Sequence, residues 1–148
     1  MKKILILNGP NLNMLGLREP EIYGHDTLED IRALCEETAR KKGMEIDFRQ
    51  SNHEGDLIDW IQEERENIDA LVINAAGYTH TSVALHDALK LLKVPVIEIH
   101  LSDPSTREAF RHFSYIASLA SAIIKGKGAR GYVEALEILS TLPENQNI

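Results

Sequence analysis

The chain has 148 residues, of which 43% are hydrophobic and 26% charged, a balance typical of a folded domain and unlike that of a disordered segment. Its 16 lysines and arginines stand against 23 aspartates and glutamates, and the net charge of −7 argues against nucleic acid or an anionic membrane as a partner. The single cysteine, Cys35, excludes an intrachain disulfide and a cysteine-rich metal centre. No apolar run approaches the ~20 residues that span a bilayer, so we expect a cytoplasmic protein.

Strand and helix patterns alternate along the chain. Residues 3–7 form a continuous apolar run, which is typical of a strand buried on both faces. Thr27 begins a capping-box pattern that ends at Asp30, and apolar residues recur from there at helical spacing to about Lys41. Apolar and polar residues then alternate over 44–49, which predicts a strand near the edge of a sheet.

The second half of the chain continues this alternation. Residues 70–73 are the most strand-like run, and Thr81 or Ser82 is a candidate cap for the helix that follows. The remaining expected elements are helices at 57–66, 83–92 and 131–142 and strands at 94–99 and 122–125. The pattern predicts an α/β, flavodoxin-like fold, with a five-stranded parallel sheet and helices on both faces. We expect one domain over residues 1–148, with 143–148 as a frayed tail.

Polar side chains follow four of the predicted strands. Ligands of such folds bind beyond the carboxyl ends of the strands, and these ends are rich in amides, hydroxyls and imidazoles. The polar segments are 8–13, 50–55, 74–82 and 98–103. Their convergence predicts a site for a small, hydroxyl-rich molecule. The sequence contains no G-x-x-x-x-G-K-[ST] phosphate loop, and we expect no dinucleotide or nucleoside-triphosphate site.

Residues 16–25 lack periodicity and are flanked by glycines, which predicts a mobile lid. The lid carries Arg18 and Tyr23. A phenol is a usable base only as the phenolate, and a nearby guanidinium favours that form. Arg107 is a second cation that could have the same effect. From the residues alone, Tyr23 is either such a base or an anchor that packs the lid on the core.

Four blocks of sequence occur in order over nearly the whole chain. They are 8–24 (NGPNLNMLG, REP and YG), 51–55 (SNHEG), 78–85 (YTHTSVAL) and 98–112 (EIHLS, RE and FRH). Together they resemble the type II 3-dehydroquinate dehydratase family. The resemblance implies a flavodoxin-like fold and the trans-dehydration of 3-dehydroquinate to 3-dehydroshikimate on the shikimate route to chorismate. It also implies that no metal or other cofactor is used and that the protein is a homo-oligomer, a dodecamer built from trimers.

The resemblance also implies a role for each site residue. Water elimination from this substrate requires a base, a place for enolate charge and an acid for the leaving hydroxyl. By resemblance, Tyr23 is the base and Arg18 holds it as the phenolate, while Asn11 stabilises the enolate. The acid is His100, and Glu98, two residues earlier on the same strand face, orients it. Substrate binding is expected of Asn74, His80, Leu101, Ser102 and Arg111, together with Asp87 from a neighbouring subunit.

Two segments depart from the usual sequence of that family. Residues 75–77 are Ala-Ala-Gly, where Pro-Gly-Ala or Pro-Ala-Ala is usual, and residues 103–106 are Asp-Pro-Ser-Thr, where Asn-Ile-His-Ala is common. Two other classes of protein remain open: a module that binds a small polyol or acid without turnover, and a flavodoxin-like cofactor carrier. The enzyme is favoured because mere binding does not require Tyr23 and Arg18 on one lid with Glu98 and His100 opposite.

Overall fold

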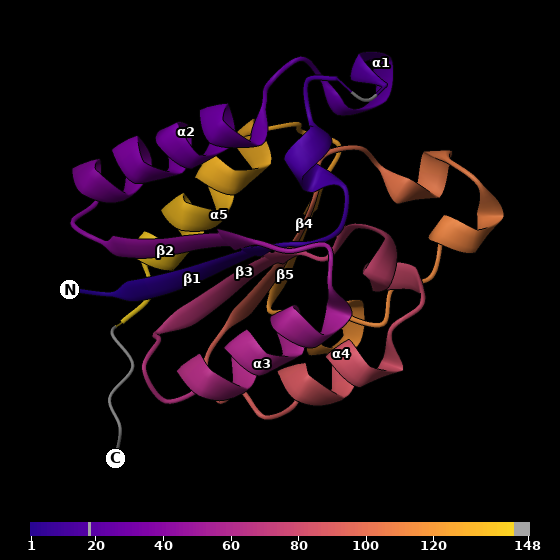
Figure 1. The fold of residues 1–148 in the computed structure, drawn as a ribbon. Coiled ribbons are helices and arrows are strands. Elements are labelled where there is room, and N and C mark those ends of the chain that lie inside the picture. Colours follow the sequence, from indigo (N-terminus) through magenta and orange to yellow (C-terminus); the bar gives the residue numbers. More distant parts are fainter. Residues whose placement is uncertain (18, 144–148) are drawn as a thin grey trace.

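The computed structural model describes residues 1–17 and 19–143, and its centre is a five-stranded parallel sheet (Figure 1). The order of the strands across the sheet is β2-β1-β3-β4-β5. This is the flavodoxin-like order, so the predicted fold class is confirmed. The strands are β1 (Lys3–Asn8), β2 (Glu45–Gln50), β3 (Ala70–Asn74), β4 (Val96–His100) and β5 (Ala122–Lys125).

Helices cover both faces of the sheet (Figure 1). One face carries α2 (Leu28–Lys41) and α5 (Arg130–Ser140), and the other carries α3 (Glu54–Glu64) and α4 (Val83–Leu89). The shorter helical turns are α1 (Pro20–Tyr23), η1 (Leu12–Met14), η2 (Ala76–His80), η3 (Pro104–Thr106), η4 (Ala109–Arg111) and η5 (Ala117–Leu119). Among residues 1–17 and 19–143, no helix combines the length and the apolar character that crossing a bilayer requires.

The sheet separates two hydrophobic cores because successive side chains of a strand point to opposite faces. In β1, Ile4 and Ile6 belong to the core with α2 and α5, whereas Leu5 and Leu7 belong to the core with α3 and α4. All four side chains are buried, which explains why this strand is a continuous apolar run. β2 lies at an edge of the sheet, as its alternating sequence predicts.

The predicted helix caps are partly confirmed. Thr27 Oγ1 accepts a hydrogen bond from the Asp30 amide (3.1 Å), and Asp30 Oδ2 accepts one from the Thr27 amide (3.0 Å), so the capping box of α2 is present. Of the two candidates for α4, Ser82 is the cap and accepts from the Leu85 amide at 2.8 Å. β4 begins later than expected because Pro95 has no backbone N–H for a neighbouring strand.

The predicted lid contains one helical turn, α1, which begins at Pro20. Proline suits this first position because its fixed φ is helical and its missing N–H would have had no partner there. Tyr23 is the last residue of this turn. Arg18 lies outside the described residues, as do 144–148 of the expected tail. The mobility of segment 16–25 stays a prediction.

Gly9 brings the segments after β1 and β3 into contact. Its amide donates to the Asn74 carbonyl at 2.8 Å. A Cβ at this position would lie 2.5 Å from the Ala75 carbonyl oxygen, so only glycine permits the approach. This contact places Asn11 and Asn74 on the same rim of the sheet.

A Gly9→Ala substitution is therefore expected to lower the free energy of unfolding by about 2 kcal/mol, because the added methyl group overpacks a backbone contact. Urea denaturation followed by circular dichroism measures this. Gly55→Ala is the matched control, since a Cβ at Gly55, in α3, meets nothing within 4 Å and alanine favours the helix. Equal stabilities for the two variants would contradict the proposed packing constraint.

Candidate active site

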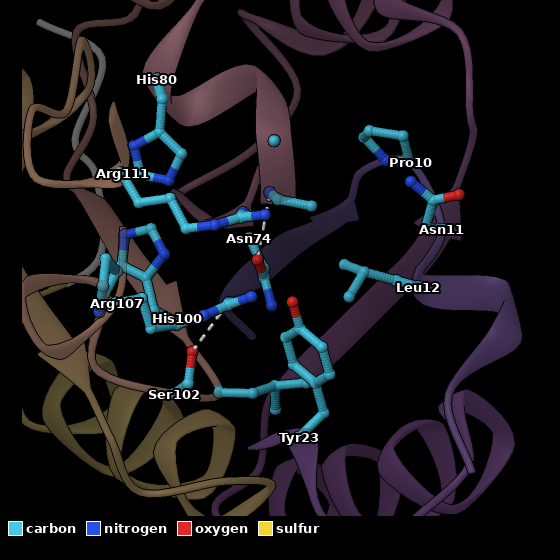
Figure 2. A pocket seen from close by; sticks show the side chains of 14 residues that line it. Pro10, Asn11, Leu12, Tyr23, Asn74, His80, His100, Ser102, Arg107 and Arg111 are labelled. Carbon is cyan, nitrogen blue, oxygen red and sulfur yellow. Dashed lines mark hydrogen bonds between the residues drawn. The ribbon is translucent and has the colours of Figure 1, made fainter. Parts of the chain in front are cut away.

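The carboxyl ends of β1, β3 and β4 meet at a cavity of about 150 Å3 (Figure 2). Its small size suits a compact molecule rather than a dinucleotide. Most of the expected site residues line it, together with Arg107. The lining residues are Pro10, Asn11, Leu12, Tyr23, Asn74, Ala76, Gly77, His80, His100, Leu101, Ser102, Pro104, Arg107 and Arg111.

Two expected site residues do not line this cavity, and a third is not among the described residues. Glu98 lies behind His100, in contact with it. Asp87 is exposed on α4 and so is available to another copy of the chain rather than to its own cavity. Arg18 lies outside the described part of the chain, and its role stays a prediction from the resemblance.

His100 and Glu98 form a buried acid–base pair on β4. His100 donates its Nε2 hydrogen to Glu98 Oε2. Glu98 is only 1% exposed and His100 8%, so water does not weaken the pair. A carboxylate in this place stabilises the positive charge of a protonated imidazole. With Nε2 engaged, Nδ1 is the ring nitrogen that can deliver a proton.

His80 stands beside His100, with 6.3 Å between the ring centroids. Burial lowers the pKa of the His80 imidazole below its usual value, and the nearby His100 and Arg111 charges add to this effect. The neutral ring is thus favoured near neutral pH. Its Nδ1 donates to the Phe113 carbonyl at 2.8 Å, which leaves Nε2 as a hydrogen-bond acceptor. His80 is therefore suited to accept from a ligand hydroxyl.

Tyr23 reaches the cavity from the end of α1, and its hydroxyl points inward (Figure 2). The guanidinium carbon of Arg107 lies 5.0 Å from the centroid of the Tyr23 ring. Arg107 also donates to Ser102 Oγ at 3.4 Å. A cation is thus present beside the phenol, and it comes from the segment after β4.

Asn74, at the end of β3, is held on both sides of its carboxamide. Nδ2 donates to the Tyr132 hydroxyl at 3.1 Å, and Oδ1 accepts from the Ala76 amide at 3.2 Å. The Tyr132 hydroxyl in turn donates to Asn8 Oδ1 at 2.7 Å. The phenol of Tyr132 is fully buried, and burial raises its pKa, so it remains a donor. These bonds fix which amide atom of Asn74 faces each way.

Tyr132 is not among the site residues expected from the sequence, and the structure gives it this polar role. The one general indication of such a role is that the hydroxyl of a buried tyrosine usually has a hydrogen-bond partner. The two partners, Asn8 and Asn74, lie 124 and 58 positions away in the chain, so spacing alone could not identify them.

A Tyr132→Phe substitution is expected to leave Asn8 and Asn74 each without one buried partner. The free energy of unfolding should fall by about 1–3 kcal/mol, and KM should rise because the Asn74 amide can rotate. Urea denaturation and steady-state kinetics measure the two effects. Tyr78→Phe is the control, because it removes a hydroxyl that donates at 2.8 Å to the exposed Asn52 carbonyl. Similar losses in both variants would contradict a special role for Tyr132.

Two residues that line the cavity have left-handed backbone conformations. Asn11 has φ 70° and Ala76 has φ 52°. Asparagine tolerates this region, whereas for alanine it costs about 1–2 kcal/mol. Ala76 lies in the first segment that departs from the usual family sequence. Strained residues of this kind are often found at functional sites, where surrounding contacts maintain them.

The second departing segment directs its charge away from the cavity. Asp103 Oδ1 accepts from the Ser105 amide and hydroxyl at 3.0 and 2.7 Å, and Lys125 Nζ lies 3.8 Å from it. The Ser105 hydrogen bonds are the main cause that lowers the pKa of Asp103. Pro104, and not Asp103, lines the cavity.

A glycine-rich segment supports the end of β4. Residues 126–131 directly follow β5 and lead into α5. They have the G-x-G-x-x-G spacing that is typical of dinucleotide-binding loops, a spacing that the expectation of no dinucleotide site did not take into account. Here the Gly126 and Gly128 amides donate to the Ser102 and Leu101 carbonyls at 3.1 and 3.0 Å. These amides are therefore not directed at a phosphate. The Leu101 C=O and the Ser102 N–H belong to one trans peptide group, in which the two bonds point in opposite directions. Because the Leu101 carbonyl faces Gly128, the Ser102 N–H points away from this segment.

The cavity is lined by cationic side chains and by side chains that can exchange a proton, namely imidazoles and the Tyr23 phenol. Arg107, Arg111 and two imidazoles line it, and no carboxylate does among the described residues. Such a lining suits a small carboxylate, which arginine binds with good geometry. Within the described chain no group of three or more His, Cys, Asp or Glu side chains could hold a metal ion. The fold and site define a flavodoxin-like α/β protein with a small cationic cavity, lined by imidazole and phenol groups, at the carboxyl ends of its strands.

Comparison with known proteins agrees with this class. Residues 2–140 match the model of the family described as dehydroquinase class II. The chain belongs to the class II dehydroquinase family. It is 59% identical over 141 residues to the 3-dehydroquinate dehydratase of Phenylobacterium zucineum strain HLK1, covering 95% of this chain and 97% of that protein.

Solved structures of the family have the same fold. The type II dehydroquinase from Propionibacterium acnes superposes with a TM-score of 0.93 at 41% identity, covering 96% of this chain and 98% of that one. The type II dehydroquinase from Butyrivibrio crossotus DSM 2876 gives 0.92 at 43% identity, covering 95% and 98%.

Proposed function

We propose that the chain is a lyase that catalyses the trans-dehydration of 3-dehydroquinate to 3-dehydroshikimate through an enolate, without a metal or organic cofactor. The observation that carries the proposal is the pair of opposed proton-transfer groups, Tyr23 on α1 and the His100–Glu98 pair on β4, across a cationic cavity. A relative that is 59% identical to this chain is named 3-dehydroquinate dehydratase, which supports the proposed activity.

In the proposed reaction Tyr23, as the phenolate, removes the proton from the carbon beside the ketone. The electron pair moves to the ketone oxygen, and Asn11 stabilises the resulting enolate charge. When the enolate collapses, the bond to the hydroxyl on the next carbon breaks, and His100 donates its proton so that water leaves. Arg18, by family resemblance, and Arg107, by its contact with the Tyr23 ring, favour the phenolate.

Substrate binding follows from the polarity of each group. Arg111 and the backbone of Leu101 and Ser102 bind the carboxylate, while Asn74 and the neutral His80 bind hydroxyls. We also propose a single catalytic domain over residues 1–148, whose segment 16–25 closes as a lid, and a dodecamer built from trimers. Asp87 would then complete the site of a neighbouring subunit, which its exposed position on α4 supports.

An ultraviolet assay tests the proposed activity. The product is a conjugated enone and absorbs where 3-dehydroquinate does not, so purified protein should produce a rising absorbance. The same rate is expected after treatment with a chelator and in the presence of borohydride, because neither a metal nor an imine takes part. Absence of turnover in a folded protein that still binds the substrate would favour a binding module instead.

A further inference from the structure

We propose that Ser114 is a positioning residue that holds the Glu98 carboxylate in the orientation that supports His100. This inference rests on the proposed function, in which His100 is the acid. Ser114 follows η4 in the chain and does not line the first cavity. Its hydroxyl donates to Glu98 Oε2 at 2.8 Å.

The direction of that hydroxyl is determined by its other contacts. A serine hydroxyl has one hydrogen and two acceptor positions. Ser114 Oγ accepts from the Ile116 amide and from the Ala117 amide, both at 3.1 Å. Both acceptor positions are thus used, and the single hydrogen is left for Glu98. In this arrangement Ser114 can act toward the carboxylate only as a donor.

Such a donor can bind Glu98 only at an oxygen that carries no hydrogen. Glu98 is 1% exposed, and its Oε2 receives hydrogen bonds from both Ser114 and His100. Oε1 is buried and has no hydrogen-bond partner among the described residues. A hydrogen on Oε1 would find no acceptor in the described chain, and a hydrogen on Oε2 could be accepted only by His100 Nε2, which would displace the hydrogen that the imidazole donates there. The hydrogen bond from Ser114 therefore holds Oε2 as the oxygen that faces His100.

The segment that carries Ser114 is anchored to the rest of the site. The Tyr115 amide donates to the Thr79 carbonyl at 2.9 Å, and His86 donates to the Tyr115 carbonyl at 2.5 Å. Phe113, on the other side of Ser114, accepts from His80. Residues 113–115 thus hold both imidazoles of the cavity, His80 directly and His100 through Glu98.

Other charges lie near Glu98. Glu98 and Ser114 line a second cavity of about 310 Å3 behind His100. The titratable and charged groups that share it are His80, His100, Arg111, His112 and Lys125. None of these except His100 makes a hydrogen bond to Glu98 in the described chain, so a Ser114 substitution should act first on His100.

Three substitutions separate positioning from a merely structural cap. Ser114→Ala removes both the cap of the 116–117 turn and the donor, and Ser114→Thr keeps both. Ser114→Asp keeps the acceptor but replaces the donor with a second carboxylate beside Glu98. We expect kcat at neutral pH to fall about 10–100-fold in the alanine and aspartate variants, the range for losing a hydrogen bond to a charged group. The threonine variant should retain most of the activity. Full activity in Ser114→Asp would overturn the proposal.

A measurement that does not depend on turnover tests the role of Ser114 separately from the proposed dehydratase activity. The titration of His100 is followed by 15N NMR of the whole protein, with its signals assigned by their loss in His100→Gln. In Ser114→Ala its midpoint should move to lower pH by about one unit, because the imidazolium loses support from a correctly held carboxylate. An unchanged midpoint would overturn the inference. A shifted midpoint in a protein that lacks the dehydratase activity would refute the proposed function and leave the role of Ser114 intact.

Discussion

A Tyr23→Phe variant is expected to lose about 10²–10⁴-fold in kcat, since removal of a general base typically costs this much. The substitution deletes only a hydroxyl that faces the cavity, so folding and substrate affinity should change little (Figure 2). The enone assay measures turnover, and isothermal titration with 3-dehydroquinate measures binding.

Tyr78→Phe is the matched control for this experiment. Tyr78 also has a polar hydroxyl near the rim, but it donates to the Asn52 carbonyl and does not line the cavity. Its kcat should stay close to that of the unmodified protein. Near-normal turnover in Tyr23→Phe would refute the assignment of the base and would favour the role of a lid anchor.

Substitution of His100 is expected to have an effect of similar size on turnover, but the choice of residue matters. In His100→Ala the buried Glu98 carboxylate loses the imidazole and keeps only the Ser114 hydroxyl as a partner. Loss of one member of such a buried pair costs about 3–5 kcal/mol of stability. In His100→Gln the side-chain amide can still donate to Glu98 but cannot release a proton. The glutamine variant should therefore be folded and inactive, with a kcat lower by about 10²–10⁴-fold.

Thermal denaturation and the enone assay, applied to both variants, separate the two effects. His53→Gln serves as the control, because His53 is exposed and its side chain makes no capping hydrogen bond to α3. It should match the unmodified protein in both measurements. A His100→Gln protein that retains activity would show that another group protonates the leaving hydroxyl.

The fold could be predicted from the sequence because its signals are local. A buried parallel strand is a continuous apolar run, as in residues 3–7, and the Thr27–Asp30 capping box marks the start of α2. The polar residues at the carboxyl ends of the strands could be predicted for the same reason, because the end of each apolar run can be located in the sequence. The pairing of Glu98 with His100 was also predictable, because a spacing of two residues on a strand gives one face.

The supporting contacts could not be predicted in this way. Ser114 and Tyr132 reach the site from segments whose position depends on tertiary packing, and neither has a distinctive spacing. The 126–131 segment has a distinctive spacing, but its amides bind the Leu101 and Ser102 carbonyls, which no local pattern reveals. Sequence patterns thus predict the residues that line the cavity better than those that hold them.

The hydrogen bond from Tyr132 to Asn8 also has a consequence for protein synthesis. It joins residues 124 positions apart, so the end of β1 is held by a helix that is translated more than a hundred residues later. A nascent chain released before α5 is made would lack this support for Asn8 and Asn74. The site can therefore be completed only after α5 has left the ribosome, and products that terminate before α5 should have little capacity to compete for the substrate.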